Sequence, residues 1–441
     1  MLYLASLLLA LVPAVRSAYC HGKPDPNAPA NTFPFVTTEP VLNKTVTNGK
    51  LFSAGPPDQP FWIIHVYGTS YERGFAQGAL MGEIARDMLN DTWNYMVEQA
   101  ASNLGNLPPW LADLIAEVGM DIALEVTYDW TSKYTDPGFY EEMHGLADGA
   151  GVDFTILRDI HLIGSLTQGD CSLIGAWGDA TQDGKTLQLR ALDWDTGTPF
   201  RHYHAVLVEH PTDGGHAYAS VGFVGWLGAL TGISEEGMAI SEIGIAFPDA
   251  TFGNESRVGI PFVVLLRDIL LYDKTLNDTI TRIKEAHRTC DLVFGVGHGA
   301  EQKVLMFEYS ETAAYAMDDK NLRPLNTTWH NRMEGDCCVY LLVSLLFLLF
   351  CSVVYLGMDW DCPGYNLVLQ DELQKYHGSL TPDNIAHEIT ARTQTGSTHI
   401  AVYDLTEQVM YVAFLDVNDN PAYTRPYTQL DAKKLFSEPK P

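Results

Sequence analysis

Short apolar strands separated by glycine and Asp-Gly turns dominate the chain after residue 170, and this pattern constrains the fold most strongly. Segments such as 171–179, 185–194 and 238–247 are rich in alternating apolar residues and are bounded by turn residues. Strands joined by such short turns pair in antiparallel fashion. Before residue 170 the pattern is mainly helical. Helices segregated from antiparallel strands predict an α+β fold built in layers.

The remaining expectations concern the chain outside these strands. Residues 19–60 are rich in Pro, Asn and Thr, which predicts an extended or loop-rich lead-in. The segment from Phe61 begins as a strand and continues into a long amphipathic helix. A closing hairpin with alternating apolar residues is expected around Thr406 and Glu407. Further helices are expected at residues 108–127, 137–150 and 260–287.

The charge balance excludes some classes of partner. The 441 residues contain 27 Lys and Arg against 55 Asp and Glu, a formal net charge of −28. Nucleic acids and anionic membrane surfaces both demand a basic face, so neither is expected as the main partner. The 46% of apolar residues indicates a globular chain with a sizeable core. Protonation of carboxylates at acid pH relieves self-repulsion, which favours an acidic working compartment.

Several features fit passage through the secretory pathway. Residues 1–18 form a short apolar run ending in small residues, as a signal peptide does; the alternative is a buried N-terminal helix. Seven cysteines are an odd number for an oxidising compartment, and their pairing stays open. None has zinc-ligand spacing, and no metal or cofactor is expected. We expect a secreted or lysosomal glycoprotein, with sequons at Asn43, Asn90, Asn254, Asn277 and Asn326.

A second apolar stretch allows three interpretations. Residues 339–358 carry no charge over a length that can cross a bilayer. They could instead form a buried strand or helix, although the run shows neither period. The third interpretation is that 337–352 is foreign to the fold, such as a translated intron. We favour the third, because removing this piece joins a loop to a strand-like segment at Val353. Membrane association therefore stays open.

The segment most informative about chemistry is Gly169-Asp170-Cys171-Ser172, which is followed by Arg190 and by Asp193-Trp194. Asp183-Gly184 is a hairpin turn signal, so the strand leaving Cys171 folds back and brings these residues towards it. A thiol needs a lowered pKa or a nearby base to act as a nucleophile, and a guanidinium favours the thiolate. A carboxylate such as that of Asp193 can hold an amine in position.

These residues resemble the choloylglycine-hydrolase group of N-terminal-nucleophile amidases. That group includes penicillin V acylase, acid ceramidase and the aminopenicillanic acid acyltransferase-like proteins, and its members share a Cys start followed by R-x-x-D-W. The segments YERGFAQG (71–78), GWLGALTG (225–232) and the closing hairpin are also similar to family motifs, in the same order over residues 60–425. The resemblance implies a four-layer αββα N-terminal-nucleophile hydrolase sandwich with a mainly helical N-terminal part.

The resemblance also implies roles for individual residues. The precursor would cleave itself between Asp170 and Cys171, leaving chains 19–170 and 171–441 as a heterodimer. Cys171 would be nucleophile and, through its freed α-amine, general base. Arg190 would stabilise the thiolate, and Asp193 would orient the amine. The alternatives are a small buried side chain or disulfide half at Cys171 and a strand-end ion pair for Arg190 and Asp193.

Other assignments are partial matches. Glu242 lies where acid ceramidases have a site glutamate, with a solvated strand residue as the equal alternative. The oxyanion hole of the family contains an Asn in a T-N-aromatic context. Here Thr328 occupies that place, so the candidate is Asn331, with Asn366 as its rival. Trp194 and Trp226 could line an acyl pocket, although single aromatics are more often core residues.

The sequence therefore predicts an amidohydrolase that cleaves an N-acylated amine or a lipid amide. The alternatives are an acyltransferase and a secreted or membrane-tethered binding protein that has lost catalysis. A papain-type protease is opposed by the glycine-rich strand context of Cys171. The identities of the acyl chain and the amine, and the choice between hydrolysis and transfer, stay open.

Overall fold

The computed structural model describes residues 24–25, 27–102, 115, 119–164, 170–194, 196–244, 256–321, 351–357 and 363–441. Its strands are β1 (Val41–Val46), β2 (Gly49–Ala54), β3 (Phe61–Gly68), β4 (Asp170–Gly178), β5 (Gly184–Asp193), β6 (His204–Pro211), β7 (Tyr218–Phe223), β8 (Thr231–Ser234), β9 (Met238–Gly244), β10 (Leu292–His298), β11 (Lys303–Tyr309), β12 (Ala314–Met317), β13 (Val353–Gly357), β14 (His399–Asp404), β15 (Val409–Phe414) and β16 (Thr428–Asp431).

Its helices are α1 (Ser70–Ser102), α3 (Met120–Thr131), α4 (Pro137–Ala150), α5 (Phe154–Gly164), α6 (Phe262–Tyr272), α7 (Leu276–Glu285), α8 (Pro363–Tyr376), α9 (Pro382–Asn384), α10 (Thr390–Thr393) and α11 (Ala432–Phe436). A π-helical turn, Ile385–Ile389, joins α9 to α10. Short 3₁₀ turns occupy Ser132–Tyr134, Pro199–His202 and Ala422–Thr424.

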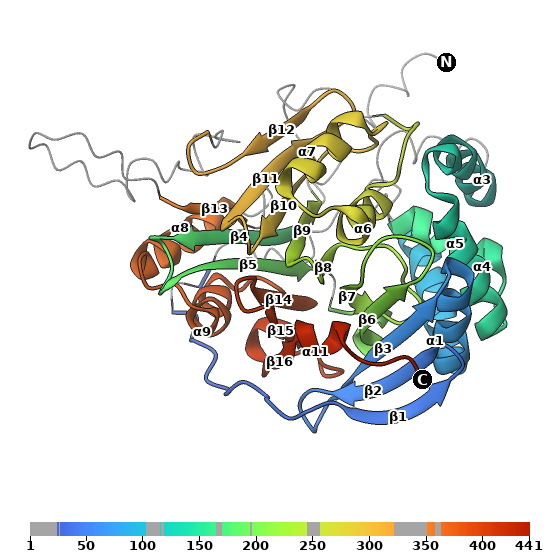
Figure 1. Ribbon diagram of the computed structural model, residues 1–441, viewed down its shortest axis with the longest axis horizontal. Coiled ribbons are helices and arrows are strands. Elements are labelled where there is room, and N and C mark those ends of the chain that lie inside the picture. Colours follow the sequence, from blue (N-terminus) through green and yellow to red (C-terminus); the bar gives the residue numbers. More distant parts are fainter. Residues whose placement is uncertain are drawn as a thin grey trace, which may run out of the picture.

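Within the described residues, the strands form two sheets that pack face to face. The larger has the order β1-β2-β3-β6-β7-β8-β9-β10-β11-β12, and the smaller has the order β13-β4-β5-β14-β15-β16. Helices α1, α4, α5, α6 and α7 cover the outer face of the larger sheet, while α8 and the π-helical turn cover that of the smaller. In Figure 1, α1, α4 and α5 lie on the opposite side of the molecule from α8 and α9. The predicted α+β fold, a four-layer αββα sandwich, is confirmed.

The apolar interior between the sheets is formed by every second residue of the strands, because these residues share the inward face. Leu173 and Leu192 of the smaller sheet pack against Ile243 and Met306 of the larger. Successive side chains of a strand point to opposite faces, so the alternate residues pack under the outer helices. Both faces are therefore covered over the middle of each sheet, whereas the edge strand β1 is exposed. This explains why these strands show long apolar runs and not a strict alternation with polar residues.

The lead-in contains a hairpin that the sequence analysis did not anticipate. Strands β1 and β2 pair through a two-residue loop, and Asn48 takes the left-handed conformation that such a loop requires, with φ of 60°. Residues 41–54 are extended, as expected, but they pair as a hairpin that the residue types did not predict. Together with β3, which runs parallel to β6, the hairpin makes the N-terminal segment part of the larger sheet. Both segments flanking Cys171 thus build one sandwich.

Of the helices expected from the sequence, one is found as predicted and one is divided in two. Helix α4 covers the expected residues 137–150. The single helix expected at 260–287 is instead two, because α6 ends before Asp273 and the Thr275 side chain caps the start of α7 by accepting from the Asp278 backbone N–H. Of the helix expected at 108–127, the structure describes α3 from residue 120 onward.

The second apolar stretch is only partly described. Its end, Val353–Gly357, is strand β13, which pairs with β4 beside Cys171 and is buried. A strand that begins at Val353 agrees with the interpretation in which removal of residues 337–352 joins a loop directly to a strand. Residues 337–350 and residues 1–18, where a signal peptide is expected, lie outside the described residues. In the described part of the chain, we find no helix with the length and apolarity needed to cross a membrane.

The motif YERGFAQG (71–78) has a packing role. Added Cβ atoms at Gly74 and Gly78 would lie 1.8 and 2.5 Å from backbone atoms of α4, and the facing Gly145 and Gly149 are equally crowded against α1. The glycines therefore let the two helix backbones approach more closely than any side chain would permit. The resemblance in this motif reflects how the helical layer packs and not the chemistry of the site.

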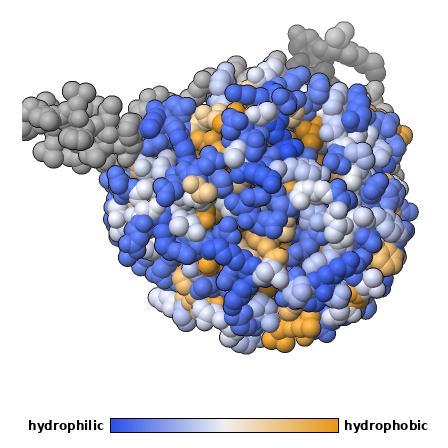
Figure 2. Space-filling model, in the orientation of Figure 1, coloured by the Kyte–Doolittle hydropathy of each residue, from blue (hydrophilic) through white to orange (hydrophobic). Residues whose placement is uncertain are grey.

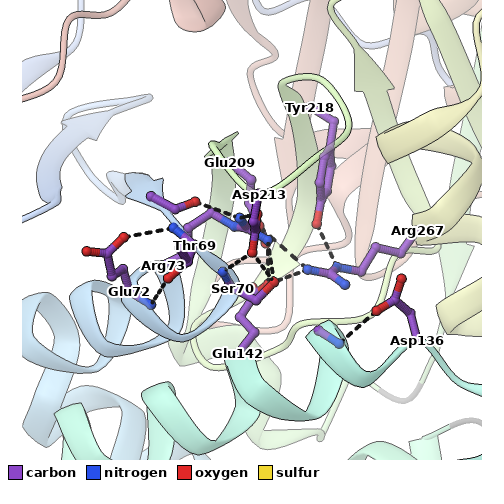
Figure 3. Close-up of polar contacts among 12 residues, drawn as sticks. Thr69, Ser70, Glu72, Arg73, Asp136, Glu142, Glu209, Asp213, Tyr218 and Arg267 are labelled. Carbon is purple, nitrogen blue, oxygen red and sulfur yellow. Dashed lines mark hydrogen bonds and ion pairs between the residues drawn. The ribbon is translucent and has the colours of Figure 1, made fainter.

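Arg73 of the same motif anchors that layer to the larger sheet (Figure 3). Its guanidinium lies 2.7 Å from Glu209 of β6 and 3.2 Å from Glu142 of α4, and all three side chains are buried. Arg267 of α6 also pairs with Glu142 and donates to the Tyr218 hydroxyl over 2.7 Å. Buried charges are tolerated only when they are paired in this way. The network thus fixes α1, α4 and α6 over one region of the sheet.

Polar side chains dominate the face of the molecule that Figure 2 shows. The face in Figure 2 is mainly hydrophilic, with apolar residues in small separate patches. Of the expected glycosylation sites, Asn43, Asn90 and Asn277 are exposed, whereas Asn254 and Asn326 lie outside the described residues.

The close approach of α1 and α4 gives a stability prediction. Gly74→Ala places a methyl group against the backbone oxygen of Glu142, which cannot move aside, so the free energy of unfolding should fall by about 3 kcal/mol. Gly295→Ala is the matched control, because its neighbours lie 3.6 Å away or farther, and it should cost less than about 1 kcal/mol. Urea unfolding of both variants checks this. Equal losses would contradict the close packing.

Candidate functional site

Cys171 lies near the start of β4, and its thiol faces the space between the sheets. Its side chain is 1% exposed, and the thiol is free. Cys171 pairs with Leu192 of β5, which in turn pairs with His399 of β14. Residues directly opposite one another across strands project from the same face of a sheet. The register that the sequence could not fix therefore puts Cys171, Leu192 and His399 in one row.

Arg190 is the hub of the site. Its Nη2 lies 3.4 Å from the Cys171 sulfur and 3.1 Å from Glu242 Oε2, while Nη1 lies 3.2 Å from His399 Nε2. Its Nε donates to the Glu242 backbone oxygen. The guanidinium is fully buried. It therefore joins three strands of two sheets through one planar group, which a lysine could not replace.

Asp193 is held beside the scissile position. It pairs in register with Asp170, the residue before Cys171. Its carboxylate accepts hydrogen bonds from Thr395 Oγ1 at 2.7 Å and from the backbone N–H groups of Gly396 and Ser397 at 2.8 Å. These bonds use three of about four acceptor positions of a carboxylate, so one position remains for an amine at Cys171.

The electrostatics of the thiol differ from the expectation that Arg190 holds a thiolate. Burial raises the pKa of the Cys171 thiol well above its ordinary value; the charge of Arg190 opposes this rise, and those of Glu242 and Asp193 add to it. Arg190 is shared among several groups, so its charge does not overcome the burial. In the continuous chain the thiol is therefore protonated at neutral pH, and its proton must pass to another group as the sulfur reacts.

Glu242 is buried at 4% exposure, so the alternative of a solvated strand residue is wrong. Burial raises the pKa of its carboxyl group, which the Arg190 guanidinium opposes. Cys171, Glu242, Trp194 and Trp226 line one pocket with about 750 Å³ of empty space including its mouth. The aromatic residues that the sequence left as core or pocket residues thus line the pocket that contains the thiol, and Trp226 stacks on His161 with ring centroids 4.6 Å apart.

His399 also belongs to the site, although no motif in the sequence pointed to it. The histidine begins an apolar strand, and only the register of β14 against β5 brings it next to Arg190. Its Nε2 also lies 3.0 Å from the hydroxyl of Thr231, which belongs to the GWLGALTG segment. Burial lowers the pKa of His399 well below its ordinary value, and the nearby Arg190 lowers it further. The ring is therefore neutral.

Neither of the two asparagines expected in an oxyanion hole is found beside Cys171 in the described part of the chain. Asn331 lies outside the described residues. Asn366 of α8 is buried, and its Oδ1 accepts from the Gly357 backbone N–H at 2.8 Å. It lies on the Ser172 side of β4, the face opposite to the Cys171 side chain, so its structural role is to hold β13. Among the described residues, no cluster of three or more His, Cys, Asp or Glu side chains is arranged to hold a metal ion.

Fold and site together define an αββα sandwich with a buried thiol near the start of a central strand, beside an arginine and two carboxylates. The chain belongs to the family of protein dcd1A from Dictyostelium discoideum. It is 33% identical to dcd1A over 430 residues, covering 92% of this chain and 93% of that protein. Protein dcd1B of the same organism is 29% identical, with 93% of this chain and 81% of that protein covered. No protein-family model matches the sequence.

Three solved structures show lower similarity. The Caenorhabditis elegans N-acylethanolamine-hydrolyzing acid amidase ortholog is 15% identical with a TM-score of 0.37, covering 54% of this chain and 93% of its own. A Clostridium perfringens conjugated bile acid hydrolase variant is 14% identical with a TM-score of 0.38, covering 60% and 95%. Agrobacterium tumefaciens penicillin V acylase is 11% identical with a TM-score of 0.36, covering 60% and 87%. The fold assignment therefore rests on the two sheets and their helical layers.

The position of Glu242 gives a prediction about thiol reactivity. Glu242→Gln removes a negative charge beside Cys171, so the pKa of the thiol should fall and alkylation by iodoacetamide at neutral pH should become several-fold faster. Glu285→Gln, an exposed site on α7, is the control and should leave the rate unchanged. Peptide mass spectrometry follows modification of Cys171 alone. Slower alkylation in Glu242→Gln would show that the carboxylate does not act on the thiol.

Proposed function

We propose that this chain is an amidohydrolase that cleaves the amide bond of an N-acylated amine or lipid amide, with Cys171 as its N-terminal nucleophile. The observation that carries the proposal is the Cys171 thiol in contact with Arg190, next to Asp193 and at the floor of a largely apolar pocket. A buried nucleophile under an apolar pocket suits a substrate with an apolar acyl group. Arg190 also contacts side chains from three other strands, which is more than an ordinary ion pair at a strand end would need.

The first proposed step is cleavage of the chain itself. The Cys171 sulfur adds to the carbonyl carbon of Asp170, and the peptide nitrogen leaves as the α-amine, taking up the thiol proton. The product is a thioester between the two residues. Water then hydrolyses the thioester, which leaves a carboxylate on Asp170 and returns the thiol. The register that pairs Asp170 with Asp193 supports this step, because it places a carboxylate next to the amine that forms.

Turnover then follows the same chemistry on the substrate. The freed α-amine takes the thiol proton, and the sulfur adds to the amide carbonyl carbon of the substrate. The amine returns the proton to the leaving nitrogen, which departs as the free amine. Water hydrolyses the resulting acyl thioester, releasing the acid. If a second amine arrived before water, the product would be a transferred acyl group, so acyl transfer is the same mechanism with another acceptor.

The high pKa of the thiol supports a requirement for cleavage. A protonated, buried thiol is a poor nucleophile towards a separate substrate, and His399, the histidine that contacts Arg190, already uses Nε2 to accept from that arginine. An α-amine has an ordinary pKa of about 7.7–8, low enough to act as a base where a lysine could not. A binding protein without catalysis would have no need for the cut. Detection of the cut therefore separates the two candidate functions.

The cleavage prediction is direct. Wild-type protein should yield a second chain that begins with Cys171, and Cys171→Ala should remain a single chain without amidase activity. Cys290→Ala removes another thiol, which is part-buried and outside the pocket, and should still cleave. Gel electrophoresis with N-terminal sequencing of the fragments is the measurement. Equal amidase turnover from uncut wild type and uncut Cys171→Ala would rule out the mechanism.

The burial of residue 171 predicts the pH profile. Burial and the nearby Arg190 guanidinium disfavour the charged form of an amine at residue 171, and we expect them to outweigh the opposing effect of Asp193, so the freed α-amine should titrate below its ordinary range of about 7.7–8. Because the base must be unprotonated, the acid limb of kcat/KM should then lie below about pH 7. This fits the proposed acidic setting of a secreted or lysosomal enzyme. Activity on an N-acyl amine panel that rises steadily to about pH 8 would contradict it.

A further inference from the structure

The pocket over Cys171 contains two buried N–H groups that have no hydrogen-bond partner in the described part of the chain. They are Nδ1 of His399 and Nε1 of Trp194, and both residues line the pocket. In folded proteins roughly nine in ten buried polar groups are paired. Two unpaired groups of one kind around one pocket indicate that a ligand supplies their partners.

The contacts of His399 show that its Nδ1 atom, which has no partner among the described residues, is a hydrogen-bond donor. Arg190 carries only N–H donors, and its Nη1 lies 3.2 Å from Nε2 of the ring. Nε2 must therefore accept, which places the ring proton on Nδ1 of a neutral imidazole. The indole Nε1 of Trp194 is a donor under all conditions. The pocket thus presents two donors, so the matching ligand atoms are acceptors.

The strand register separates the His399 donor from the reacting atoms. Cys171 and His399 flank Leu192 on either side, two strand spacings apart, a distance of about 10 Å between backbones. Arg190 lies between the two side chains, against the Cys171 sulfur and against Nε2 of His399, so Nδ1 on the other side of the ring points away from the carbon that the sulfur attacks. The acceptor must lie farther along the substrate.

The rest of the pocket limits the charge of that acceptor. Apart from Cys171, Glu242 and the two donors, the lining is largely apolar and includes Met96, Ile160, Phe200, Phe223 and Phe262. A charged group would lose its hydration there without gaining an ion-pair partner, because Arg190 is already paired with Glu242. An uncharged oxygen such as a ketone or ether fits better.

We propose that His399 and Trp194 are specificity-determining residues, which select substrates whose apolar body carries an uncharged acceptor oxygen. The proposal rests on the proposed function in placing the scissile amide at Cys171. Leaving a buried donor unpaired costs binding, so a substrate with a plain saturated chain should be discriminated against by about 10- to 100-fold.

Binding to the Cys171→Ala protein tests the selectivity without turnover. The ligands are an N-acyl amide with a saturated chain and a series of the same amide in which one chain methylene is replaced by a ketone, moved along the chain. Calorimetric titration should show at least one ketone position with about tenfold or higher affinity over the saturated ligand. Equal affinities across the whole series would overturn the proposal. Because no catalysis is involved, this result stands even if the amidase activity is absent.

Two isosteres of His399 then assign the effect to Nδ1. His399→Asn keeps an N–H group near the Nδ1 position, so the ketone preference should persist. His399→Gln keeps an acceptor near the Nε2 position for Arg190 but removes the donor, so the ratio of the two affinities should fall towards one. The opposite order would show that His399 acts only by supporting Arg190 and would overturn its assignment. Trp194→Phe provides a second readout and should lower the ratio several-fold.

His204 is the matched control. It is another buried histidine with an unpaired Nδ1, and its pKa is lowered to about 4 by burial, but it lines a different pocket and its Nε2 contacts the Leu415 backbone oxygen. His204→Phe should leave the ketone preference unchanged. A loss equal to that of His399→Gln would mean that the two rings share a structural role and would contradict recognition by His399.

Discussion

The ion pair between Arg190 and Glu242 is the interaction on which the site depends. Arg190 belongs to β5 of the smaller sheet and Glu242 to β9 of the larger, so their 3.1 Å contact bridges the two sheets at the centre of the sandwich. Removing one partner of such a pair leaves an uncompensated buried charge, typically a loss of about 3–5 kcal/mol. The same guanidinium touches Cys171 and His399, so whatever sets the spacing of the sheets also sets the geometry of the thiol.

A second buried network of charged residues holds the helical layer and not the site. Arg73 and Arg267 hold the helical layer on the outer face of the larger sheet through Glu142 and Glu209. Burial raises the pKa of Glu142, although the two arginines oppose it. Each network pairs its buried arginines with carboxylates, and this pairing is what allows charged side chains to lie in the core. The resemblance at YERGFAQG therefore reports this packing, whereas the resemblance at Cys171, Arg190 and Asp193 concerns the site.

The sequence predicted the layers and part of the site. Features set by local pattern could be predicted, whereas features set by contacts between distant strands could not. Periodicity and turn residues were enough for the β4–β5 hairpin and so for the meeting of Cys171 with Arg190. They could not predict His399, because its place follows from the register between strands more than 200 residues apart. Nor could they predict that Glu242 is buried, since one charged residue in an apolar strand fits either face. The lead-in hairpin was missed because Asn and Thr are typical of both loops and edge strands.

The charges around Cys171 suggest why cleavage and activity belong together in the proposed function. In the continuous chain the buried site holds one guanidinium against two carboxylates, those of Glu242 and Asp193, and burial raises the pKa of each carboxyl group. A thiolate formed there would be a buried charge and would add to the negative charge of the carboxylates, so burial first, and then Glu242 and Asp193, raise the pKa of the thiol. Freeing the α-amine at residue 171 would bring a group that can carry a positive charge into contact with both the sulfur and Asp193. The proton that leaves the thiol would then remain inside the site as an ammonium ion, so the nucleophile forms without adding net charge to a buried region.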